Sequence, residues 1–133
     1  MKRSQKLFLV VEDFEDSRFM MRRLLEMAGY NVLEASDGEQ AVKMAVDARP
    51  ALILMDLSLP KLDGLAATRQ IRQQKGLKKV PILAVSAHDS PESRTEALEA
   101  GCNEYVTKPI DFDHLHALLQ RFVPQAKQSG STP

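Results

Sequence analysis

Two uninterrupted apolar runs place the strongest constraint on the fold of this chain. One run, residues 51–55, ends on Asp56, and the other, residues 7–11, ends on the acid pair Glu12 and Asp13. Strands buried on both faces of a parallel sheet read as continuous apolar runs, whereas strands with one solvated face alternate. The two runs therefore predict buried parallel strands, each followed by carboxylates where the chain leaves the sheet.

The rest of the chain alternates between strand and helix signals. Further strands are predicted at residues 31–35, 80–85 and 103–107. Five helices are predicted from apolar stripes and caps: one closed by Gly29, one from Asp37 to Pro50, one from Gly64 or Leu65 to Gln74, one from Ser90-Pro91 to Gly101, and one capped by Asp111. This alternation predicts an α/β fold, a flavodoxin-like, doubly wound five-stranded parallel sheet of order 2-1-3-4-5 with helices on both faces. The methionines in these segments are interpreted as core residues: Met20, Met21, Met27, Met44 and Met55.

Length and composition indicate one domain inside the cell. The chain has 133 residues, with 18 basic and 18 acidic side chains, so no net charge directs it to nucleic acid or to an acidic membrane. The basic start and the apolar run after it lack the cleavage site of a signal peptide, and no run reaches membrane-spanning length. The single cysteine, Cys102, cannot form an internal disulfide, so we expect a cytoplasmic protein. We expect a domain at 6–123, an N-terminal extension at 1–5 and a flexible tail at 124–133.

Carboxylates are expected to lie together at the carboxyl ends of the predicted strands. Because strands one and three are neighbours in this order, Glu12 and Asp13 are expected beside Asp56, with Lys108 at the end of strand five. Three carboxylates and one lysine leave a formal charge of −2, which a divalent cation would neutralise. The candidate ligands are hard oxygens, which favours Mg²⁺ or Mn²⁺ over zinc. Mg²⁺ commonly shares its ligands with a phosphate, so we expect Asp56 to act as a nucleophile toward a phosphoryl group and Ser86 to donate a hydrogen bond to it.

Simpler interpretations of the same residues stay open at this point. Asp56 can cap a turn or a helix, Asp13 can cap the first helix, and Glu12 can be a solvated surface acid. Tyr105 can be a core residue with its hydroxyl at the rim, and Lys108 can be solvated. The histidines lack metal-ligand partners at a suitable spacing and are interpreted as surface residues: His88, His114 and His116.

Four groups of residues follow one another at the predicted strand ends: Glu12-Asp13; Asp56 with Pro60, Asp63 and Gly64; Ser86-Ala87; and Gly101, Tyr105 and Lys108-Pro109. Each group alone is a weak motif, but their order and their positions at strand ends are specific. Together they resemble the receiver domain of response regulators in two-component signalling, whose chemotaxis member has the same strand order. The resemblance covers roughly residues 6–123.

The resemblance implies a phosphoacceptor site. Asp56 would accept the phosphoryl group, and Mg²⁺ would be bound by Glu12, Asp13, Asp56 and the backbone carbonyl of Ser58. Glu12 departs from the family pattern, which more often has aspartate there, and its extra methylene would reach the ion directly or through water. Leu59 stands where methionine is frequent, which we interpret as a packing change.

The resemblance also implies a switch. Ser86 and Lys108 would contact the phosphoryl group beside the small Ala87, and Tyr105 would swing inward as Ser86 moves. That movement would remodel the surface of the fourth helix, the fifth strand and the fifth helix. The Lys108-Pro109 bond is expected to be cis at Pro109. Ser58 and His88 occupy the positions that tune the lifetime of the phosphoryl group.

The resulting expectation is a signalling switch that receives phosphate from a histidine kinase or a histidine phosphotransfer protein and acts on a downstream protein, without nucleic acid or membrane. We expect no enzyme beyond slow autodephosphorylation. Because the chain begins with methionine and has little room for an output domain, a stand-alone regulator is favoured over a fragment of a longer regulator or hybrid kinase.

Two rival functions stay open. A Mg²⁺-dependent aspartyl-phosphate phosphatase usually has a second aspartate close after its nucleophile, where this chain has Ser58. A flavodoxin-like cofactor binder would need a phosphate loop rich in glycine, serine or threonine after the first strand, and this chain has none there.

Overall fold

A computed structural model describes residues 6–123, and the extension and tail expected at 1–5 and 124–133 lie outside the described residues. The strands are β1 (Leu7–Val11), β2 (Asn31–Ala35), β3 (Leu52–Asp56), β4 (Ile82–Ser86) and β5 (Glu104–Thr107). The helices are α1 (Glu15–Met27), α2 (Gly38–Ala48), α3 (Gly64–Gln73), α4 (Pro91–Ala100) and α5 (Phe112–Phe122). All strand pairs are parallel, and the sheet has the order β2-β1-β3-β4-β5. The predicted fold class is confirmed.

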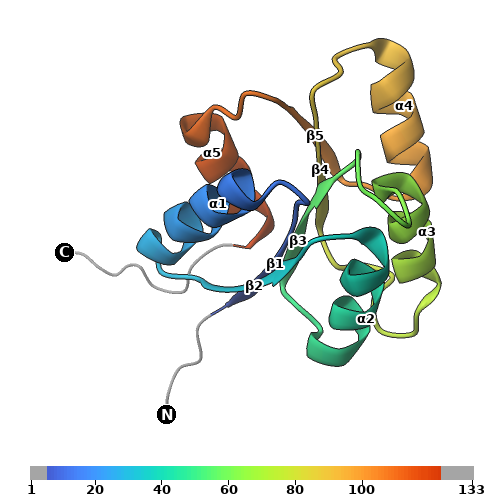
Figure 1. The fold of residues 1–133 in the computed structure, drawn as a ribbon, viewed down its shortest axis with the longest axis horizontal. Helices are drawn as coiled ribbons and strands as arrows, with labels where there is room; N and C mark the ends of the chain where they lie inside the picture. Colours follow the sequence, from blue (N-terminus) through green and yellow to red (C-terminus); the bar gives the residue numbers. More distant parts are fainter. Residues whose placement is uncertain (1–5, 124–133) are drawn as a thin grey trace.

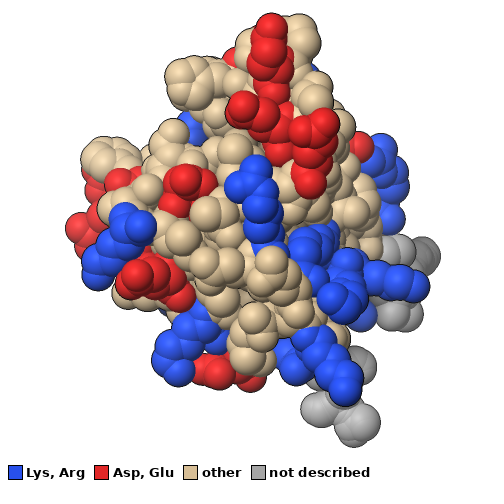
Figure 2. Space-filling model, turned by 90° about the vertical axis from the view of Figure 1, so that its right-hand side faces the viewer, with Lys and Arg blue, Asp and Glu red and all other residues tan. Residues whose placement is uncertain are grey.

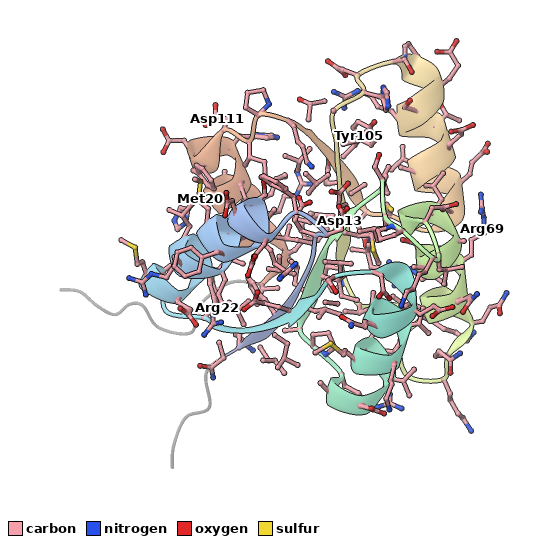
Figure 3. All side chains as sticks on the ribbon, viewed as in Figure 1. Asp13, Met20, Arg22, Arg69, Tyr105 and Asp111 are labelled. Atoms are coloured by element: carbon pink, nitrogen blue, oxygen red, sulfur yellow. The ribbon has the colours of Figure 1, made fainter. Side chains whose placement is uncertain are left out.

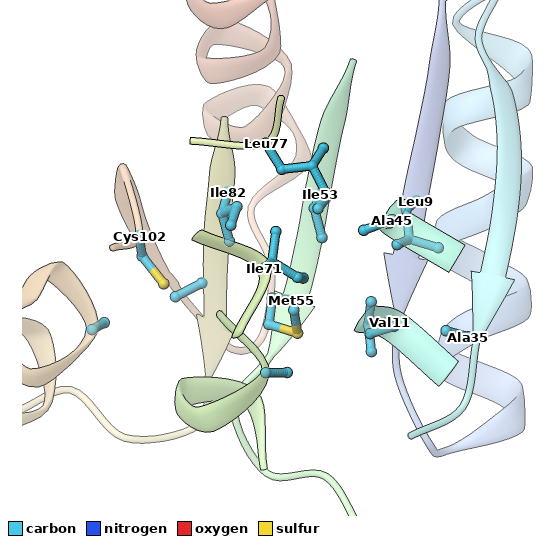
Figure 4. Close-up of a cluster of buried hydrophobic side chains, with 14 of the residues drawn as sticks. Leu9, Val11, Ala35, Ala45, Ile53, Met55, Ile71, Leu77, Ile82 and Cys102 are labelled. Atoms are coloured by element: carbon cyan, nitrogen blue, oxygen red, sulfur yellow. The ribbon is translucent and has the colours of Figure 1, made fainter. Parts of the chain in front are cut away.

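The sheet is sandwiched between two layers of helices. Helices α1 and α5 lie on one face, and α2, α3 and α4 cover the other (Figure 1). All five residues of β3 and all five of β4 are buried, which is why both segments are apolar throughout. Figure 4 shows the core on the α2–α3 face, where Leu9, Ile53 and Ile82 from neighbouring strands pack with Ile71 of α3. None of the helices between residues 6 and 123 combines the length and the apolarity that crossing a bilayer requires.

Three predicted caps begin helices in the structure. The carboxylate of Asp37 accepts the N–H of Gln40, the hydroxyl of Ser90 accepts that of Ser93, and the carboxylate of Asp111 accepts two N–H groups of α5. Each cap satisfies donors that a helix leaves unpaired at its start. Side chains next to the loops therefore set where these helices begin.

The fourth strand is shifted from its predicted position. It runs from Ile82 to Ser86 rather than over residues 80–85. Val80 continues the apolar run, but Pro81 has no N–H to give to the ladder, and only its carbonyl is used, as acceptor for Ile53. At the other end Ser86 is part of the strand and is aligned with Thr107 of β5.

The interpretation of all five methionines as core residues is wrong for two of them. Met20 and Met27 are 57% and 74% exposed, whereas Met21 and Met55 are buried. Met20 and Met27 are seven residues apart on α1 and therefore share a face, which is turned about 100° away from the buried stripe that contains Met21. A count of methionines could not distinguish these two faces.

Helix α4 is packed against the rest of the domain by small side chains. Its only buried residues are Ala97 and Ala100, and Leu98 is 53% exposed. Acidic side chains dominate its outer surface and gather at the top of Figure 2, which views the side of the molecule formed by α2, α3 and α4. Because two methyl groups interlock little with their surroundings, α4 is attached less firmly than α5, which buries three leucines.

Candidate functional site: a carboxylate cluster at the edge of the sheet

Parallel pairing of β1 with β3 brings three carboxylates together. Val11 is aligned with Met55, so Glu12, which follows β1, lies beside Asp56, the last residue of β3. One carboxylate oxygen each from Glu12, Asp13 and Asp56 lies within 4.8 Å of the other two. Figure 3 shows Asp13 near the middle of the molecule, beyond the carboxyl end of β1 and just before α1 begins. The convergence expected from the strand order is therefore present.

The carboxylate of Asp56 is buried and held at both oxygens. Its side chain is 4% exposed. Oδ1 accepts the backbone N–H of Ser58 at 2.9 Å, and Oδ2 accepts Lys108 Nζ at 3.1 Å. An ionised carboxylate only accepts hydrogen bonds, so these two donors fix the plane of the Asp56 carboxylate. Asp56 is thus a buried carboxylate of defined orientation, as a nucleophile would require.

Glu12 is also buried, and its surroundings act on its charge in opposite directions. Oε2 accepts the N–H of Phe14 at 3.0 Å, and Oε1 accepts Lys108 Nζ at 3.2 Å. Burial raises the pKa of Glu12 above its ordinary value, and the nearby charge of Asp56 adds to the increase. The hydrogen bond from Phe14 and the charge of Lys108 lower the pKa but do not cancel that increase.

Lys108 joins the two buried carboxylates. It follows β5, where its backbone N–H donates to the carbonyl of Ser86 at 2.8 Å, and its peptide bond to Pro109 is cis. Partial burial works against its charge, but the hydrogen bonds and charges of Asp56 and Glu12 outweigh that effect and raise the pKa of Lys108. The ammonium group therefore stays protonated at neutral pH. Its side chain is 33% exposed, so it also faces the opening of the site.

The donor set fits a hard divalent cation. Three carboxylates and one ammonium leave two negative charges within a few ångströms, two of the carboxylates being almost fully buried. Carboxylate oxygens are the ligands that Mg²⁺ prefers, and one or two of them are its usual share from a protein. A single lysine cannot neutralise this group, so a cation with two charges is the natural complement.

Comparison with known proteins identifies the family. Residues 8–120 match the response regulator receiver domain. The chain belongs to this family. Among curated proteins, it is 38% identical over 122 residues to the alkaline phosphatase synthesis transcriptional regulatory protein PhoP of Bacillus subtilis, covering 92% of this chain and 50% of that protein. It is 36% identical to the phosphate regulon transcriptional regulatory protein PhoB of Pseudomonas aeruginosa, over 86% of this chain and 50% of that one. The chain spans about half the length of these curated relatives.

Solved receiver structures have the same fold. The receiver domain of a sensor histidine kinase from Pseudomonas aeruginosa has a TM-score of 0.85 and 38% identity, covering 92% of this chain and 100% of its own, and it contains a magnesium ion coordinated in its active site cleft. The chemotaxis protein CheY4 of Vibrio cholerae has a TM-score of 0.85 and 32% identity, covering 90% and 100%.

The expected switch residues of this receiver domain are linked by hydrogen bonds. Ser86 is 3% exposed, and its hydroxyl oxygen accepts the N–H of His88 at 3.1 Å, while Ala87 and His88 are exposed. The carbonyl of His88 accepts the hydroxyl of Tyr105 at 2.7 Å. Tyr105 is 6% exposed and lies on β5 beside α4 (Figure 3). The loop after β4 thus connects the carboxylate edge to the ring of Tyr105.

Two arginines that surround this site escaped the sequence analysis. Arg18 of α1 donates to the carbonyl of Glu12 at 3.0 Å and to the carboxylate of Glu34 at 2.9 Å, so it ties the acid pair to α1 and β2. Arg94 of α4 lies over the ring of Tyr105 at 5.0 Å, within the range of a cation–π interaction. Each arginine contacts residues of neighbouring elements, and a spacing along the chain does not indicate these contacts.

Proposed function

We propose that this protein is a phosphorylation-dependent switch that accepts a phosphoryl group on Asp56 from a histidine kinase or a histidine phosphotransfer protein. The observation that carries the proposal is the arrangement around Asp56, a buried carboxylate at a strand end that shares an amine with Glu12. Membership of the receiver family supports it.

The protein's part in the transfer is positioning and charge. An oxygen of Asp56 would bond to phosphorus as the bond from phosphorus to the donor's imidazole nitrogen breaks, and the imidazole would take up a proton as it leaves. The Ser58 N–H and Lys108 orient the carboxylate, and Lys108 remains a positive charge for the incoming phosphoryl oxygens. The hydroxyl of Ser86 would contact the same oxygens.

We propose Mg²⁺ as the cofactor, bound by Glu12, Asp13, Asp56 and the backbone carbonyl of Ser58. The mutual distances of the three carboxylates and their excess charge support this ligand set. When bound, the ion supplies positive charge to the phosphoryl oxygens. The magnesium ion in the related receiver domain from Pseudomonas aeruginosa is in keeping with this choice.

The output would pass through the surface formed by α4, β5 and α5 to a downstream protein. Hydrogen bonds link Ser86 to His88 and His88 to Tyr105, and they support this path. A new contact that moves Ser86 would also move His88 and the ring of Tyr105. Ser58 and His88 flank the phosphoryl position and would set its lifetime. We propose a cytoplasmic protein that signals by protein contact. The longer relatives named as transcriptional regulators make a regulator with a separate output domain the alternative.

The test measures phosphoryl uptake by the mass of the intact protein. The protein with a small-molecule phosphodonor and Mg²⁺ should gain one acid-labile phosphoryl group, and Asp56→Asn should gain none. Asp47→Asn is the matched control, because Asp47 is an exposed aspartate on α2. Uptake by Asp56→Asn at the rate of the unchanged protein would refute the assignment.

A further inference from the structure

The start of α2 touches the loop between β3 and α3 at unusually close range. Gly38 is the first residue of α2 and is buried. A Cβ atom at this position would lie 1.7 Å from the carbonyl oxygen of Leu62 and 2.8 Å from its Cβ. Contacts below 3.0 Å are essentially absent for real Cβ atoms. The glycine therefore allows α2 to approach the loop backbone more closely than any other residue would permit.

A second contact joins the same two segments. Asp37, the capping residue of α2, is 6% exposed, and Oδ1 accepts the N–H of Gln40. Its other oxygen, Oδ2, lies 3.8 Å from Nζ of Lys61. Lys61 has φ of 67°, in the left-handed region that non-glycine residues seldom adopt. The cap and the first residue of α2 thus contact two consecutive residues of the loop, one of them in a strained conformation.

A second glycine approaches the loop backbone closely where the loop meets α3. A Cβ atom on Gly64, the first residue of α3, would lie 2.3 Å from the carbonyl oxygen of Asp56 and 2.7 Å from Cα of Leu57. The N–H of Gly64 donates to the carbonyl of Leu57 at 3.2 Å. Ser58 lies between these two glycine contacts, and its N–H is bound to Asp56.

We infer that Gly38 is a positioning residue for the phosphorylation site, because the close approach of α2 sets where the β3–α3 loop places the backbone carbonyl of Ser58. The inference rests on the proposed function, in which that carbonyl is a ligand of Mg²⁺. Alanine at position 38 would have to move the Leu62 carbonyl from 1.7 Å to at least 3.0 Å, a shift of about 1.3 Å. Mg²⁺ demands near-ideal geometry at short range, so it tolerates such a shift of a ligand poorly.

The experiment compares Gly38→Ala with Ala45→Gly. Ala45 lies on the same helix but packs into the core, so its substitution weakens α2 without touching the loop. Mg²⁺ affinity by calorimetry and amide hydrogen exchange of residues 57–63 in the metal-free protein are measured for both. Gly38→Ala should weaken Mg²⁺ binding about tenfold, the lower range for groups that orient metal ligands, and speed exchange in the loop. Ala45→Gly should leave both within about twofold, a margin set by its lack of ligand contacts.

A merely structural role for Gly38 would lower thermal stability in both variants and leave Mg²⁺ affinity unchanged, and that result would overturn the inference. Phosphoryl uptake by Gly38→Ala should recover at saturating Mg²⁺. If Gly38→Ala does not fold, Leu62→Gly removes the Leu62 Cβ that lies beside Gly38 and loosens the same contact. Unchanged Mg²⁺ affinity and loop exchange in that variant would again refute the role. Failure of the unchanged protein to take up phosphate, with normal Mg²⁺ binding, would instead refute the proposed function alone.

Discussion

Replacing Lys108 with methionine should destabilise the metal-free protein by about 2–3 kcal/mol. Loss of one partner from a buried ion pair costs about 3–5 kcal/mol, because the remaining charge is left without compensation. Here two carboxylates, of Asp56 and Glu12, lose an amine at 3.1 and 3.2 Å. The lysine side chain is 33% exposed, so water replaces part of the lost interaction and reduces the expected cost to about 2–3 kcal/mol.

The assay is urea unfolding monitored by circular dichroism at pH 7.5, once in EDTA and once in Mg²⁺. An ion that binds only the folded protein stabilises it by about 2.7 kcal/mol at one hundred times its dissociation constant. In that excess of Mg²⁺, Lys108→Met should therefore become about as stable as the unchanged protein is in EDTA. The control is Lys43→Met, which breaks an exposed pair with Asp47 and should change stability by less than about 0.5 kcal/mol.

The same variant has a predicted pH dependence. Glu12 has a raised pKa in the folded protein, mainly through burial, so the folded state holds that proton more tightly than the unfolded state does. Its contribution to stability is present below the ordinary value of 4.5 and is lost as pH rises through the folded pKa. Without Lys108 the pKa rises further, so the deficit of Lys108→Met should shrink between pH 7.5 and pH 5. A variant as stable as Lys43→Met in EDTA at pH 7.5 would refute the electrostatic argument.

Two further predictions concern the surroundings of the site. Gly64→Ala should cost about 3 kcal/mol of unfolding free energy, because its Cβ would meet the Asp56 carbonyl at 2.3 Å, whereas Ala66→Gly on the same helix should cost about 1 kcal/mol or less. Glu34 is partly buried, which favours its neutral form, but Arg22 and Arg18 of α1 form ion pairs with it that outweigh this effect and lower its pKa. The stability that Glu34 adds is present above 4.5 and is lost as pH falls through its lowered pKa, so Glu34→Gln should unfold at a lower temperature than the unchanged protein at pH 7. That difference should shrink as pH falls below 4.5, and a difference independent of pH would exclude the ion pairs as its cause.

The fold was predictable from the sequence because its signals are local. The apolar runs at β1 and β3, and the caps at Asp37 and Asp111, are properties of a few consecutive residues. The proximity of Glu12 to Asp56 followed from strand order, since the carboxyl ends of neighbouring parallel strands lie together. These signals need no knowledge of side-chain orientation.

The remaining features depend on how packed elements are rotated and spaced. The position of Met27 on the exposed face of α1 follows from the helix's rotation, and the sequence was misread there. The contact of Arg18 with the carbonyl of Glu12, and that of Gly38 with Leu62, require two segments to approach within a few tenths of an ångström of contact. No pattern along the chain encodes such a distance.

Helix α4 buries only Ala97 and Ala100. This bears on how the downstream protein that such a receiver binds could be changed. Most of the helix's side chains contribute little to folding, so they can be exchanged with a small effect on stability. The carboxylates proposed to bind Mg²⁺ lie in other elements and would be unaffected. A protein engineer should therefore be able to redirect the proposed output by substituting residues on the outer face of α4 while leaving the proposed phosphoacceptor site in place.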